Sequence, residues 1–202
     1  MKTTVFTLAV FAGLSTASPV ANTNIESLNI QNPADSPTTL IIDISGINSW
    51  DEQGSTLNEI LITSFPSQFQ ITGISWDIIL TTVGGSWLSE PNIRMSNSDG
   101  SGSFTFAPGE GSDFPGTMVS FTGSVDLVAL GEDFTTNADN LLNFEFFESF
   151  DDVSGDIDAF YEAGSTLTIH LKKVPAPGSL ALLGFGSLVA TRRRRTVRTF
   201  QS

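Results

Sequence analysis

The chain has 202 residues, no cysteine and a formal net charge of −13 at pH 7. All 22 acidic residues lie between Glu26 and Glu162, whereas residues 18–171 contain one basic residue, Arg94. This charge distribution excludes nucleic acid as a partner, because phosphate contacts require Lys and Arg side chains. The lack of cysteine excludes thiol catalysis and Cys-ligated zinc.

Residues 1–17 have the pattern of a secretory signal peptide. Lys2 supplies the positive start, residues 5–14 form an apolar core, and Ser15-Thr16-Ala17 supplies the small residues that signal peptidase reads. We therefore predict a signal peptide over residues 1–17, cleavage by signal peptidase, and export of the remaining chain. Residues 18–39 contain Pro, Asn, Ser and Thr, which predicts an irregular lead-in.

Residues 40–173 contain short stretches of alternating apolar and polar residues, separated by Gly, Asn, Asp and Ser. This period of two predicts one all-β domain, an antiparallel β-sandwich of about seven to nine strands with no α-helix of consequence. In residues 74–81, one face carries Ile74, Trp76 and Ile78, which we expect in the core. The predicted strands cover residues 40–44, 59–63, 74–81, 104–107, 119–128, 141–150 and 166–171.

Three motifs in this region carry a resemblance to known modules. They are ITGISWD at residues 71–77, GSWLSE at 85–90 and FFESFDD at 146–152. In pattern they are similar to the jelly-roll accessory modules of exported bacterial proteins and to the convertase P-domain, whose family can carry structural calcium. The resemblance implies a jelly-roll topology instead of an immunoglobulin-like one.

An acidic turn follows the aromatic stretch at residues 141–150. It contains Asp151, Asp152, Asp156 and Asp158. Several carboxylates close together suit calcium, a hard cation that takes about six to eight oxygen ligands. The spacing differs from that of an EF-hand loop, and a solvated acidic turn is the alternative interpretation. Structural calcium is the one cofactor that the sequence suggests.

Trp50, Trp87 and Tyr161 stand near turns rich in Gly, Ser and Asp. Such rings can stack on sugars, which makes these three residues candidate ligand contacts; the alternative is that they lie at the rim of the core.

Catalytic residues are not evident in the sequence. Glu145 and Glu148 suggest the carboxylate pair of a glycoside hydrolase, but residues three positions apart on a strand face opposite sides of a sheet. His170 is the only histidine, so a catalytic triad or a His-based zinc site has no second member. Its place on the polar face of the last strand predicts a surface residue. We therefore predict no enzymatic activity.

The end of the chain combines a Pro-containing motif, an apolar segment over residues 180–190 and a basic cluster. The motif is Val174, Pro175, Ala176, Pro177 and Gly178, and the cluster is Arg192, Arg193, Arg194 and Arg195. The prolines hold the chain extended before a short hydrophobic helix. That helix is shorter than the roughly 20 residues that span a bilayer, and the arginines predict its cytoplasmic end. A permanent single-span anchor and a final helix packed on the core are the alternatives.

This arrangement over residues 174–202 resembles the PEP-CTERM sorting signal of Gram-negative bacteria, which is processed by the membrane protease exosortase. The family usually carries Glu between the prolines, where this chain has Ala176, so the class of sorting enzyme stays open. The resemblance implies a non-enzymatic protein that passes through the inner membrane with its body in the periplasm and reaches the cell surface or extracellular matrix. A carbohydrate-binding module for exopolysaccharide is the first alternative, and a carboxylate-based glycoside hydrolase the second.

Overall fold

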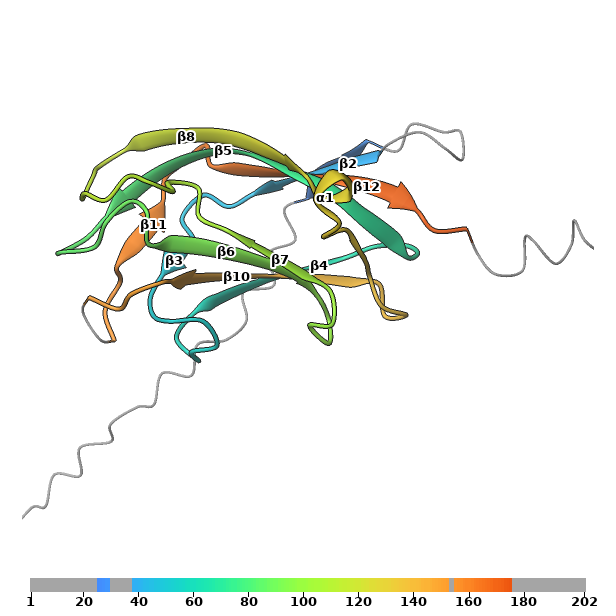
Figure 1. Ribbon diagram of the computed structural model, residues 1–202, viewed down its shortest axis with the longest axis horizontal. Coiled ribbons are helices and arrows are strands. Elements are labelled where there is room, and N and C mark those ends of the chain that lie inside the picture. Colours follow the sequence, from blue (N-terminus) through green and yellow to red (C-terminus); the bar gives the residue numbers. More distant parts are fainter. Residues whose placement is uncertain (1–24, 30–37, 153–154, 176–202) are drawn as a thin grey trace, which may run out of the picture.

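The computed structural model describes residues 25–29, 38–152 and 155–175 (Figure 1). The predicted signal peptide, the arginine cluster and most of the sorting motif lie outside the described residues. Among the residues that are described, no helix is long and apolar enough to cross a membrane.

Strands make up most of the described structure. Twelve strands and one short helix follow one another along the chain: β1 Ile25–Asn29, β2 Thr38–Asp43, β3 Asn48–Ser49, β4 Glu59–Ser64, β5 Phe69–Thr82, β6 Pro91–Asn97, β7 Ser103–Phe106, β8 Val119–Asp126, α1 Leu127–Leu130, β9 Phe134–Thr135, β10 Leu141–Glu148, β11 Ala159–Tyr161 and β12 Thr166–Lys173.

The strands form two antiparallel sheets that lie face to face (Figure 1). The larger sheet contains β1, β2, β12 and β5 in that order, with β8 on the free side of β5. The smaller sheet has the order β4-β10-β6-β7. Apart from the consecutive strands β6 and β7, the main strands alternate between the sheets along the chain. The eight main strands, β2-β12-β5-β8 and β4-β10-β6-β7, have the arrangement of a jelly roll. The prediction of an all-β antiparallel sandwich with jelly-roll character is thereby confirmed.

The hydrophobic core lies between the two sheets and follows the alternation of the sequence. Trp76 of β5, predicted to lie in the core, is half-buried and packs against the core, with 4.7 Å between its ring centroid and that of Phe106 on β7. Among the core residues that are 0% exposed are Ile74, Ile78 and Leu80 of β5 and Phe144 and Phe146 of β10.

Two predictions of local structure are wrong. Part of the lead-in, predicted to be irregular, is ordered because residues 25–29 pair with β2 and extend the sheet. The strand predicted over residues 119–128 ends at Asp126, whose side chain accepts a hydrogen bond from the Ala129 N–H at 3.1 Å and caps α1. Gly131, in the left-handed conformation, ends that helix after one turn.

Candidate functional site

Several loops converge at one end of the sandwich, on the left in Figure 1, and we call this the loop end. It consists of residues 83–90, 112–118, 149–152 and 156–158. Backbone hydrogen bonds connect these loops to one another. The Leu88 N–H donates to the Phe114 carbonyl at 3.0 Å, and the Ser149 N–H donates to the Glu90 carbonyl at 3.0 Å.

Two carboxylates are fully buried beneath the loop end. Glu148, the last residue of β10, and Asp158, just before β11, are both 0% exposed. Their backbones are fixed by hydrogen bonds to the segment at residues 49–51: the Glu148 N–H donates to the Asp51 carbonyl at 2.9 Å, and the Asp158 N–H donates to the Ser49 carbonyl at 3.0 Å. None of the four carboxylate oxygens has a hydrogen-bond partner among the described residues. A buried ion without a partner is costly, so the pair requires a proton or a cation.

The pKa of Glu148 reflects the cost of burying its charge. Burial, the largest cause, and the negative charges of Asp158, Glu90 and Asp152 together raise this pKa from 4.5 to about 9, against a lowering effect of Ser49. The Ser49 hydroxyl is near enough to favour the ionised carboxylate, yet it falls short of hydrogen-bond geometry. Glu148 is therefore held in an environment that opposes its negative charge.

Burial and neighbouring carboxylates also raise the pKa values of two other acidic residues at the loop end, Asp158 and Glu90. Burial raises the pKa of Asp158, and the charges of Asp151 and Asp152 add to this rise. Burial also raises the pKa of Glu90, with further contributions from Asp152 and Asp158. Five carboxylates thus share one region: Glu90, Glu148, Asp151, Asp152 and Asp158.

Three hydroxyl groups accompany these carboxylates. The oxygens of Ser49, Ser86 and Tyr161 are buried and have no hydrogen-bond partner among the described residues. Nowhere in the described chain do three or more His, Cys, Asp or Glu side chains already surround one point as metal ligands would. The arrangement is a buried pair of carboxylates with further oxygen atoms near it.

The four aspartates of the predicted calcium turn differ in burial, although Asp151 and Asp152 lie close enough to Asp158 for their charges to raise its pKa. Asp158 is buried, Asp151 is half-buried with one carboxylate oxygen unpartnered, and Asp152 is exposed. Asp156 is exposed, and its side chain accepts a hydrogen bond from the Ile157 N–H at 3.2 Å. Glu148 and Glu90 belong to the same group, although their positions in the sequence do not place them with the aspartates. The available signal for Glu148 was its position directly after the buried Phe146 and Phe147.

The three predicted aromatic contacts also differ from one another. Trp87 is 44% exposed and lies at the loop end, whereas Trp50 is half-buried. Tyr161 is 0% exposed, and its ring packs edge-on against Phe146 with 5.3 Å between ring centroids. The prediction that Tyr161 contacts a ligand with its ring is therefore wrong, because core packing covers it. The loop end exposes further large apolar side chains besides Trp87, namely Val83, Phe114, Met118 and Phe150.

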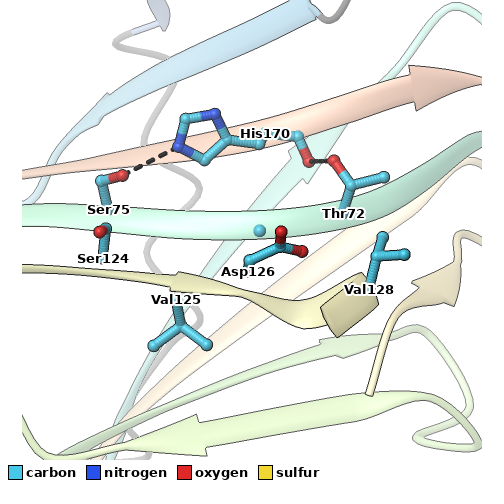
Figure 2. Close-up of a pocket in the computed structure, with 8 residues that line it drawn as sticks. Thr72, Ser75, Ser124, Val125, Asp126, Val128 and His170 are labelled. Atoms are coloured by element: carbon cyan, nitrogen blue, oxygen red, sulfur yellow. Dashed lines mark hydrogen bonds between the residues drawn. The ribbon is translucent and has the colours of Figure 1, made fainter. Parts of the chain in front are cut away.

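A second feature is a hollow of about 530 Å³ on the outer face of the larger sheet (Figure 2). Here the Ser75 hydroxyl and His170 Nε2 are 2.8 Å apart, and the Thr72 hydroxyl donates to the His170 carbonyl at 3.1 Å. Asp126 lines the same hollow, but the hydrogen bonds drawn in Figure 2 do not connect it to the His170 ring. His170 is half-buried on the polar face of the sheet.

Glu145 and Glu148 have different surroundings, as the strand geometry predicts. Glu145 is half-buried, and its carboxylate accepts hydrogen bonds from the Gly54 N–H at 2.6 Å and from the Asn58 amide at 3.1 Å. Glu148 is buried at the loop end.

Comparisons with known proteins provide little information on function. No family model matches the chain, and no curated protein matches it. Among solved structures, the chain is similar to a chain of the infectious bursal disease virus VP2 subviral particle, with 13% identity and a TM-score of 0.34. The match covers 88% of this chain and 53% of that chain, so this chain spans about half its length. At this TM-score the likeness carries no argument about function.

Proposed function

We propose that this chain is an exported, non-enzymatic protein of the cell surface or extracellular matrix, which attaches to a matrix polymer through its loop end. In this proposal, residues 174–202 direct sorting through an exosortase-type protease after signal peptidase has removed residues 1–17. The β-sandwich is the part that works outside the cell, with exopolysaccharide as the polymer.

One observation carries the binding part of the proposal. Five large apolar side chains lie exposed on adjoining loops at one end of the sandwich, where they do not pack into the core. They are Val83, Trp87, Phe114, Met118 and Phe150, each between 42% and 64% exposed. Contiguous exposed apolar groups mark interaction sites in soluble proteins.

The chemistry of the same loops supports a sugar polymer. The rings of Trp87 and Phe150 offer faces for the C–H groups of a sugar, and neighbouring polar side chains can bond its hydroxyls. Among these, the Ser89 hydroxyl donates to the Asp113 carboxylate at 2.8 Å at the surface. The acidic domain repels anionic chains, so a neutral polysaccharide fits the surface charge best.

Affinity gel electrophoresis in neutral exopolysaccharide tests this binding. The double variant Trp87→Ala/Phe150→Ala is expected to lose the retardation that the unmodified chain shows, because both stacking faces are removed. Leu130→Ala is the matched control, since Leu130 is 61% exposed but belongs to α1, away from the loop end. Equal retardation of the double variant and the unmodified chain would refute the assignment.

Sorting is expected to depend on the tail. Deletion of residues 174–202 should release the protein into the periplasm, because the deletion removes the predicted membrane segment and the arginines that orient it. Cell fractionation measures this result. A deleted form that still fractionates with membranes or reaches the surface would contradict the sorting proposal, while leaving the polymer-binding proposal untouched.

A further inference from the structure

We propose that Glu148 and Asp158 form the inner ligands of a divalent-cation site, occupied by calcium in the exported protein. Both side chains are 0% exposed, and all four of their carboxylate oxygens lack a hydrogen-bond partner within the described chain. This pair shares Asp158 with the acidic turn suggested by the sequence, and its new member is Glu148, at the end of β10.

The buried atoms without hydrogen-bond partners at this place are all carboxylate or hydroxyl oxygens. Around the two carboxylates, the Ser49, Ser86 and Tyr161 hydroxyls and one Asp151 carboxylate oxygen are also buried without partners. Protons on the two carboxyl groups would satisfy only part of this set. A cation, in contrast, accepts many oxygen ligands at once.

Within the described residues, no basic side chain lies at the loop end to neutralise the pair. Arg94 is the only basic residue among residues 18–171, and it lies on β6 opposite Glu145. Lys172 and Lys173 pair with Gln70 and Phe69, near the start of β5, whereas the loop end follows the last residue of that strand. An external cation is therefore the remaining source of positive charge for the buried carboxylates.

The oxygen-only donor set identifies the class of ion. Zinc and copper favour imidazole and thiolate ligands, whereas carboxylate and hydroxyl oxygens suit calcium and magnesium. Calcium accepts irregular geometry and more ligands, and magnesium requires a near-ideal octahedron. A pair fixed by the sheets, with further oxygens on loops, is suited to calcium.

Binding requires the outer carboxylates to turn toward the buried pair, because three acidic side chains do not yet surround one point in the described structure. Glu90 is the best placed to report this movement, since its carboxylate accepts a hydrogen bond from the backbone N–H of Trp87 at 2.6 Å. Calcium is therefore expected to change the fluorescence of Trp87. The change should be absent in Trp87→Phe and present in Trp50→Phe.

The direct test is isothermal titration calorimetry of the chelator-treated, full-length chain with calcium chloride. One calcium ion per chain is expected, with a dissociation constant on the order of 10⁻⁴ to 10⁻³ M or tighter. Glu148→Gln and Asp158→Asn keep the side-chain volume while removing the charge, and each should weaken binding at least about tenfold. Asp156→Asn is the matched control; Asp156 is exposed on the same loop, so its effect should stay within about twofold.

Terbium luminescence on the unmodified chain keeps the proposal testable if the variants fold poorly. Bound terbium excited through the aromatic rings should be displaced by calcium but not by magnesium at the same ionic strength. The proposal is overturned by equal displacement with both ions, by the absence of bound calcium, or by undiminished calcium binding in folded Glu148→Gln. Polymer retardation is measured separately in chelator, so failure of the cation site and failure of the proposed function are distinguishable.

Discussion

In the presence of chelator, the free energy of unfolding is expected to fall as the pH rises from about 6 to about 9. Burial raises the pKa of Glu148 from 4.5 to about 9 in the folded chain. Between these values the folded state holds a proton that the unfolded state has lost. Stability therefore decreases by about 1.4 kcal/mol per pH unit for this one group, and by a few kcal/mol across the window.

The sign follows from the direction of the shift. A carboxyl group with a raised folded-state pKa contributes stability that is fully present below the unfolded-state pKa and lost as the pH approaches the folded-state value. Ordinary surface carboxylates are already ionised above pH 6, so their mutual repulsion adds little further change in this window. Asp158, whose pKa is also raised by burial, adds to the effect in the same direction.

Urea denaturation at pH 6, 7.5 and 9 measures this dependence. Glu148→Gln has no proton to lose at this position, so its stability should change much less with pH, whereas Asp156→Asn should keep the dependence of the unmodified chain. A stability that rises or stays constant between pH 6 and 9 in chelator would show that Glu148 is already ionised in the folded protein.

Trp76→Ala is expected to lower the free energy of unfolding by about 3 to 5 kcal/mol, the usual cost of removing a large packed aromatic ring. Trp76 contacts Phe106 of the facing sheet, and Gly123 of β8 leaves room for its ring. A Cβ at position 123 would lie 2.2 Å from Trp76 Cζ2, which shows how closely the ring covers the neighbouring strand.

Trp87→Ala is the comparison, because the two residues are chemically identical before substitution. Trp87 is 44% exposed, so its removal should cost less than about 1 kcal/mol. Urea denaturation of both variants at one pH measures the difference. Equal losses at the two positions would contradict the packing of Trp76 against the core and the exposure of Trp87.

The sequence predicts the strands whose alternation is regular. Ile74 and Ile78 on one face of β5, and Leu167 and Ile169 on β12, are buried as their spacing requires. Residues 91–97 were not predicted as a strand, because Pro91 begins the segment and polar residues interrupt its apolar pattern. Pairing with β10 and β7 holds β6 in the sheet. The contact with β10 joins segments far apart in the chain, and local periodicity does not predict it.

The candidate site, too, was only partly predictable from the sequence. Four nearby aspartates attracted attention as a local cluster, yet only Asp158 among them is fully buried. Its partner Glu148 stands at the end of an apolar strand, and Glu90 reaches the same end of the sandwich from the connection between β5 and β6. The jelly-roll connectivity brings these groups together, and one-dimensional spacing carries no record of that arrangement.

The central position of β12 has a consequence for the order in which the domain assembles. β12 lies between β2 and β5 and is the last described strand before the predicted sorting motif, in which the Val174 N–H donates to the Gln68 carbonyl at 3.1 Å. The larger sheet cannot close until residues 166–173 have left the ribosome and, for an exported chain, the translocation pore. Pairing β2 with β12 spans more than a hundred residues, a long-range contact of the kind that slows folding. In the proposed export route, this topology would keep the larger sheet open, and the chain able to pass through a narrow pore, until residues 166–173 have crossed.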